Sequence, residues 1–176
     1  MFTVSIVTYS EVNILKDSDL KINILSKSLE YLSNAEIISQ ILIIDNSKKP
    51  LFSRFKEISS KIIYVHMLGK NLGYGKGHNL SKRFLNLKKY HLILNPDIIF
   101  YENNCLEILS KYMDDNPEVS LSQPLICSYP SKEVQKLCKQ NPTLLIQFIR
   151  LFLTRFLTKN RFLKKLNDRY EMKSLA

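Results

Sequence analysis

The chain has 176 residues, 45% hydrophobic and 24% charged, with a net charge of +10. This composition fits a globular domain and excludes a low-complexity or disordered protein. The start, MFTVSIVTYS, lacks the pattern of a signal peptide, and no run of about 18 apolar residues predicts a membrane-spanning helix. Three cysteines without CxxC spacing predict free thiols, so we expect a reduced, cytoplasmic protein.

Runs of apolar and β-branched residues predict strands, and helical spacing predicts helices between them. Because these strands are continuously apolar, the pattern predicts an α/β fold whose mostly parallel sheet is covered by helices on both faces. In chain order, strands are expected at 2–9, 41–44, 62–67, 90–94 and 119–124, with helices at 18–34, 52–59, 80–87 and 103–112.

The character of the sequence changes after residue 130. Residues 143–158, TLLIQFIRLFLTRFLT, predict a strongly apolar helix, and 159–173 predict a basic helix. Residues 130–176 hold eleven Lys or Arg against three acidic residues, a net of +8, which leaves only +2 for the rest of the chain. We therefore expect a main domain at 1–130 and a basic, partly amphipathic helical tail at 131–176.

All four glycines lie in one segment, GKNLGYGKG, at residues 69–77. Glycine adopts positive φ and allows a close backbone approach, so the segment predicts a loop that a ligand comes near. Its spacing fits neither the GxGxxG dinucleotide motif nor the GxxxxGK[ST] phosphate loop.

Polar clusters follow each of the first four predicted strands. Ligands of parallel α/β sheets bind beyond the carboxyl ends of the strands, so these clusters predict a single site at one sheet edge. The clusters are Thr8-Tyr9-Ser10, Asp45-Asn46-Ser47, the glycine segment, and Asn95-Pro96-Asp97.

Together, VSIVTYS, LIIDNS, GKNLGYGKGHN and LILNPD resemble the N-terminal half of a family 2 glycosyltransferase of the GT-A fold, in particular its rhamnosyltransferase-like group. The resemblance covers residues 2–130. It implies a Rossmann-like sheet and transfer of a sugar from a nucleoside diphosphate, with dTDP-rhamnose as the expected donor. The implied acceptor is a cell-surface polysaccharide or a polyprenyl-linked glycan.

The same resemblance implies roles for individual residues. Thr8 and Tyr9 would meet the base and ribose, and Asp45 would accept a hydrogen bond from the base imide. Asn95 and Asp97 stand where the family has its DxD motif, and Asp97 is the implied ligand of a Mg²⁺ or Mn²⁺ that also binds the donor diphosphate. The full implied nucleotide-sugar set is Thr8, Tyr9, Asp45, Asn46, Asn71, Gly73, Gly77, Asn79 and Asn95.

No catalytic base is assigned. Enzymes of this family continue into an acceptor-binding half that supplies a carboxylate base, and none of the acidic residues after Asp97 stands in that context. We therefore expect a truncated or split enzyme that binds a nucleotide-sugar weakly, if at all, and turns over nothing.

Several alternatives remain open. The chain could be an inactive nucleotide-sugar-binding fragment or a subunit of a split enzyme. A nucleotidyltransferase would need a Gly-rich basic loop after the first strand, where VTYSEVN has none. A nucleic-acid-binding protein is favoured only by the basic tail and has no RNP or zinc signature, so nucleic acid is the less expected partner.

The tail itself has two interpretations. The 143–173 segment could lie on an anionic membrane, at the inner face of the plasma membrane. Alternatively, its apolar face could pack on the missing half of the enzyme.

Overall fold

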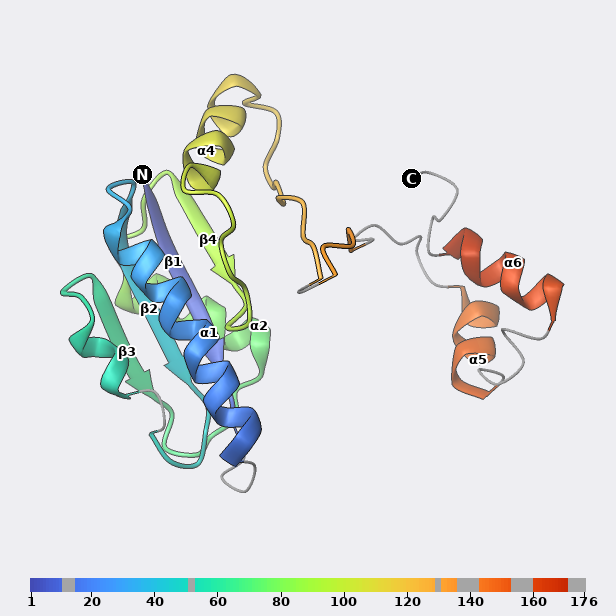
Figure 1. Cartoon of the computed structure of the whole chain (residues 1–176), viewed down its shortest axis with the longest axis horizontal. Coiled ribbons are helices and arrows are strands. Elements are labelled where there is room, and N and C mark those ends of the chain that lie inside the picture. The colour runs from blue at the N-terminus through green and yellow to red at the C-terminus, as the bar shows by residue number, and fades with distance from the viewer. Residues whose placement is uncertain (11–14, 51–52, 129–130, 136–142, 153–159, 171–176) are drawn as a thin grey trace. The chain divides into compact units, whose positions relative to one another are not determined.

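The computed structural model describes residues 1–10, 15–50, 53–128, 131–135, 143–152 and 160–170 (Figure 1). It divides into two compact units, Met1–Ser122 and Gln123–Ala176. The boundary expected at residue 130 remains a prediction.

The first unit is built on a four-stranded sheet in the order β3-β2-β1-β4, and every neighbouring pair is parallel. The predicted α/β class is therefore confirmed, as are four of the five predicted strands. At the carboxyl edge Thr8 pairs in register with Asp45, and Asp45 pairs with His66. The strands are β1 (Phe2–Thr8), β2 (Ile38–Asp45), β3 (Ile62–His66) and β4 (Tyr90–Leu94).

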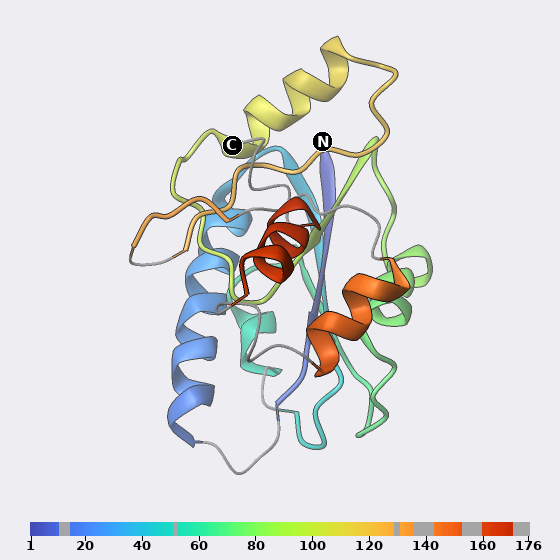
Figure 2. The ribbon, with the colours of Figure 1, turned by 90° about the vertical axis from the view of Figure 1, so that its right-hand side faces the viewer.

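One face of the sheet is covered by α1 (Leu15–Asn34), with the 3-10 helix η1 (Ser53–Glu57) on the same side (Figure 2). Leu25, Leu29 and Leu32 lie on one side of α1 and are fully buried, because their spacing of four and three residues matches the helical repeat. They pack on the alternate apolar residues of β1 and β2. Leu106 of α4 (Cys105–Asp115) joins the same core.

The opposite face is covered by two short helices, α2 (Tyr74–Asn79) and α3 (Ser81–Phe84) (Figure 2). The sequence predicts a loop over the glycine segment and a helix at 80–87, whereas the helix already begins at Tyr74. Gly73 precedes α2 with φ +73°, a conformation that glycine adopts without strain. Gly77 of α2 packs against β1, so a Cβ added at this position would come within 2.7 Å of Val7 Cγ2.

The fifth predicted strand, at 119–124, is wrong. These residues pair with no strand, and the sheet ends at β4. Two features explain the failure: Pro124 has no backbone N–H for a ladder, and Leu121 remains 86% exposed. Ordering this segment as an edge strand would bury too little apolar surface to offset the loss of conformational entropy.

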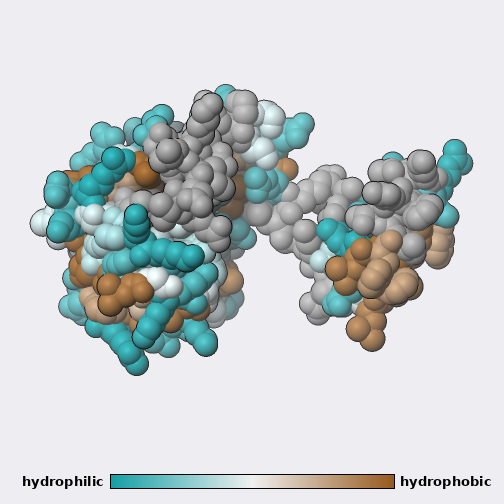
Figure 3. Space-filling model, turned by 90° about the horizontal axis from the view of Figure 1, so that it is seen from below, coloured by the Kyte–Doolittle hydropathy of each residue, from teal (hydrophilic) through white to brown (hydrophobic). Residues whose placement is uncertain are grey.

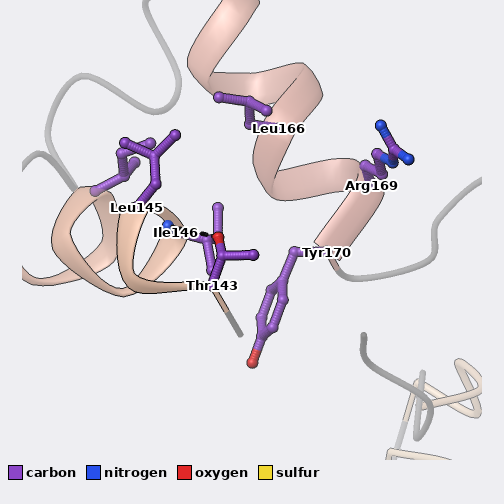
Figure 4. Close-up of a pocket in the computed structure, with 7 residues that line it drawn as sticks. Thr143, Leu145, Ile146, Leu166, Arg169 and Tyr170 are labelled. Carbon is purple, nitrogen blue, oxygen red and sulfur yellow. Dashed lines mark hydrogen bonds between the residues drawn. The ribbon is translucent and has the colours of Figure 1, made fainter. Parts of the chain in front are cut away.

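The second unit contains two helices, α5 (Leu144–Phe152) and α6 (Arg161–Tyr170). The helix expected at 143–158 is confirmed over 144–152, and its continuation at 153–159 lies outside the described residues. Ile146 and Ile149 of α5 and Leu166 and Tyr170 of α6 line a shared hollow of about 310 Å³ (Figure 4). Arg150 Nη1 donates to Asn167 Oδ1 at 2.9 Å. Among the described residues, no helix is long and apolar enough to cross a membrane.

Candidate functional site

The four polar clusters lie at one edge of the sheet, because each follows the carboxyl end of a strand and all four strands are parallel (Figure 1). We call residues 8–10, 45–47, 71–79 and 95–97 the carboxyl rim. Its first two segments are joined directly: Asn46 N donates to Thr8 O, and Ser10 N donates to Ser47 Oγ, both at 2.9 Å.

Asp45 is fully buried, and both of its carboxylate oxygens already accept hydrogen bonds. Ser47 N donates to Oδ1 at 2.9 Å, and the Tyr64 hydroxyl donates to Oδ2 at 2.6 Å. This arrangement stabilises the turn that ends β2. In this conformation the carboxylate is closed to solvent, so a nucleobase can reach it only if Tyr64 or the turn moves. The base contact expected of Asp45 therefore remains a prediction.

Asn46 differs from its neighbour. It is only 1% exposed, and its Oδ1 has no hydrogen-bond partner. A buried acceptor without a donor costs free energy, which makes this oxygen a candidate contact for an incoming donor group. Thr8 is also buried and donates to Ile44 O at 3.3 Å, whereas Tyr9 presents its ring at the surface.

Tyr74 joins the third and fourth segments of the carboxyl rim. Its hydroxyl donates to Asn95 Oδ1 at 2.9 Å. Burial and the nearby Asp97 carboxylate both raise the pKa of Tyr74, so the phenol stays protonated and able to donate at neutral pH. The structure thus brings the glycine segment to the Asn-Pro-Asp segment through a residue that sequence reasoning did not assign to the site.

The other residues of the glycine segment that were predicted for the site differ in their burial and their contacts. Asn71 Oδ1 accepts from Gly73 N at 2.9 Å and so closes the turn before α2. Asn79, at the end of α2, is exposed. Gly77 is buried against β1, so packing against the protein's own strand accounts for the need for glycine there. Any contact of Gly77 with a nucleotide-sugar remains a prediction.

A cluster of hydrogen-bonded polar side chains, which we call the buried relay, lies beneath α2. It was not predicted from the sequence. Ser5 Oγ lies 2.7 Å from His78 Nδ1 and 2.8 Å from His91 Nε2, and Thr3 Oγ1 lies 2.9 Å from His91 Nδ1. Burial lowers the pKa of His78 to about 4, with a further contribution from His91, and burial also lowers the pKa of His91. Thr3 and Ser5 alternate with apolar residues in FTVSIVT, the signal that could have revealed this polar stripe.

The expected metal ligand, Asp97, is an exposed carboxylate beside Asn95. No group of three or more His, Cys, Asp or Glu that could hold a metal occurs among the described residues. The arrangement therefore does not fit a metal centre made of protein ligands alone. It fits a hard divalent cation that takes one or two protein oxygens and most of its ligands from phosphate and water.

An all-parallel α/β sheet with polar segments gathered at its carboxyl edge defines the first unit as a Rossmann-like α/β domain. No family model matches the chain, and no curated protein matches it. Among solved structures, residues 1–349 of TarS from S. aureus are similar, with a TM-score of 0.49 and 16% identity. The similarity covers 66% of this chain and 33% of that one, so the chain spans about a third of the length of that structure.

Proposed function

We propose that the chain is a glycosyltransferase domain whose carboxyl rim binds a nucleoside-diphosphate sugar. One observation carries the proposal: the four motifs that resemble a family 2 glycosyltransferase, spread from Thr8 to Asp97, come together at one sheet edge. Parallel α/β sheets bind their ligands at that edge.

Some groups of the carboxyl rim hold its segments in place, and other groups would contact the donor; Asp45 would do both. Asp45, Gly77 and the Tyr74–Asn95 bond hold the segments in place. The exposed ring of Tyr9 and the unpaired Oδ1 of Asn46 would receive the base and ribose. The base imide would reach Asp45 by taking the place of the Tyr64 hydroxyl, because both are donors to the same carboxylate.

The exposed end of the rim would hold the diphosphate. Asp97, with Asn95 beside it, would bind Mg²⁺ or Mn²⁺ together with the phosphate oxygens. A bound divalent cation would neutralise charge on the departing nucleoside diphosphate. Tyr74 keeps the Asn95 side chain oriented through the hydrogen bond to its Oδ1.

The finer parts of the proposal concern substrates. We propose dTDP-rhamnose as the donor and a cell-surface or polyprenyl-linked glycan as the acceptor, both from the motif resemblance. The catalytic base is unassigned. The proposal for the 176-residue chain by itself is therefore donor binding without sugar transfer, which a radiolabelled transfer assay would test.

Calorimetric titration of the full chain with dTDP, and in parallel with UDP, in the presence of Mn²⁺ tests the site directly. We expect saturable binding that weakens at least roughly tenfold in Asp97→Ala, because the cation loses its protein carboxylate. Asp115→Ala is the matched control: it removes an exposed carboxylate outside the rim and should leave binding unchanged.

Two results would contradict the proposal. One is the absence of binding of either nucleotide by the wild-type chain. The other is equal binding by the wild-type chain and by Asp97→Ala.

A further inference from the structure

We propose that the second unit binds an anionic lipid surface, with the exposed apolar face of α5 inserted at the headgroup boundary and the cationic side chains of α6 held near lipid phosphates. The inference goes beyond the proposed function and does not depend on it. It rests on three observations: an uncovered apolar face, a buried opposite face, and the charge beside them.

The uncovered face belongs to α5. Five large apolar side chains of this helix are between 53% and 85% exposed, and at 100° per residue they fall within an arc of about 120°. Figure 3 shows apolar surface gathered on one side of the second unit, next to hydrophilic residues. The five side chains are Leu144, Leu145, Phe148, Leu151 and Phe152.

The other side of α5 is already occupied. Ile146 and Ile149 are 6% and 2% exposed, and they line the hollow shared with Leu166 and Tyr170 of α6 (Figure 4). The two helices therefore form their small core with one face of α5. Leu145, at the border of that face, also lines the hollow, and the other four exposed side chains do not. A contiguous exposed apolar face of this kind marks an interaction surface.

Charge identifies the kind of partner. Arg161, Lys164, Lys165 and Arg169 are exposed on α6 and outnumber its single acidic residue, Asp168. Residues 130–176 as a whole carry a net charge of +8. Long basic side chains lay their stems along apolar surface while their charged ends reach phosphate, so they can act beside an inserted helix. Basic residues near a membrane surface attract anionic lipids.

The combination favours lipid over the two other classes of partner. A nucleic acid would use the positive charge but leave the apolar face of α5 in water. A protein partner could cover the apolar face but would not by itself call for the excess of positive charge. An amphipathic helix with basic residues beside a Leu- and Phe-rich face is the pattern of interfacial membrane binding.

Vesicle flotation of the full chain tests the proposal. We expect the chain to float with phosphatidylglycerol-containing vesicles, to float less at high salt, and to float weakly with pure phosphatidylcholine. K164Q/K165Q should lower partitioning onto anionic vesicles roughly 30-fold. K88Q/K111Q is the matched control, since it removes the same charge from two exposed lysines of the first unit and should float as the wild type does.

The apolar part is tested separately. L151Q/F152Q replaces two exposed side chains and should lower partitioning at least roughly tenfold. Leu121→Gln changes an 86% exposed leucine of the first unit and should have no effect. Both sets of variants alter exposed positions, so their circular dichroism should match that of the wild type.

Insertion can be read directly because the chain contains no tryptophan. In Phe152→Trp the new indole is the sole tryptophan, and its emission should shift to shorter wavelength on anionic vesicles. In Tyr101→Trp, at an 84% exposed position of the first unit, the emission should not shift.

Three results would overturn the proposal. The first is no flotation with anionic vesicles, and the second is flotation of K164Q/K165Q and L151Q/F152Q as strong as that of the wild type. The third is salt-sensitive binding to DNA without flotation. None of these assays contains a nucleotide-sugar. If the chain does not float with vesicles, the result of the nucleotide titration can still support nucleotide-sugar binding. If the chain does not bind a nucleotide, the flotation result can still support lipid binding.

Discussion

The two units of the molecule differ in which side chains they bury. In the first, even the polar stripe of β1 is buried, and Thr3 and Ser5 are bonded to histidines beneath α2. In the second, α5 leaves five large apolar side chains in water. The first unit thus pairs the polar stripe of β1 within its own fold, whereas α5 of the second unit leaves an apolar face exposed. The following predictions test that difference.

The largest expected effect is on the core of the first unit. Leu29→Ala should lower the free energy of unfolding by about 3 kcal/mol, because a fully buried side chain is lost and a cavity is left. Leu151→Ala, at a 74% exposed position of α5, should change it by less than about 0.5 kcal/mol. Urea unfolding followed by circular dichroism measures both, and equal losses would remove the contrast between the units.

Acid should weaken the first unit through its buried relay. The pKa of His78 is about 4 in the folded protein and about 6.5 in the unfolded chain, so the unfolded chain binds more protons between these values. Stability should therefore fall as the pH drops from about 6.5 to about 4, by at most about 3 kcal/mol. His91 and Tyr74 face His78, and His91 adds to the loss in the same direction.

His78→Asn isolates this contribution. Asparagine can keep a hydrogen bond to Ser5 but does not titrate, so the variant should lose stability less steeply over the same pH range. Unfolding midpoints measured at several pH values give the comparison. An identical pH slope in the variant and the wild type would show that His78 is not the group responsible.

The close approach of α2 to β1 should tolerate no added methyl group. Gly77→Ala should cost about 2 kcal/mol, because the new Cβ would overlap Val7 Cγ2. Combining it with Val7→Ala should recover part of the loss by making room. Gly75→Ala is the control, since nothing lies within 4 Å of a Cβ at that position. Thermal unfolding of the wild type and these three variants checks the order.

The smallest expected effect is on the hydrogen bond between Tyr64 and Asp45, where protein stability and nucleotide affinity should respond differently. Tyr64→Phe removes one hydrogen bond from the buried Asp45 carboxylate and should cost about 1 kcal/mol. If the base imide takes the place of the Tyr64 hydroxyl, nucleotide affinity should be unchanged or higher in this variant. A matching fall in stability and affinity would show that Tyr64 supports the site rather than occupying it.

Much of the first unit could be predicted from sequence because its signals are local. Continuous apolar runs mark β1 to β4, and the polar residues after them mark the carboxyl rim. The prediction fails at 119–124, where a segment that ends in Pro124 pairs with no strand, and at Tyr74–Asn79, where the segment predicted as a loop is a helix that packs on Val7 through Gly77. Strand pairing and the packing of a helix on a distant strand both depend on contacts between residues far apart in the sequence.

The sequence by itself determined the strands, their polar ends and the positive charge of the C-terminal segment, because each depends on residues close together along the chain. Only the tertiary structure decided that Asp45 is closed off by Tyr64, that Tyr74 reaches Asn95, and that His78 is buried with His91. These are contacts between strands and helices far apart in the chain. Burial, which raises the cost of an unpaired or charged group, exists only after those elements have packed.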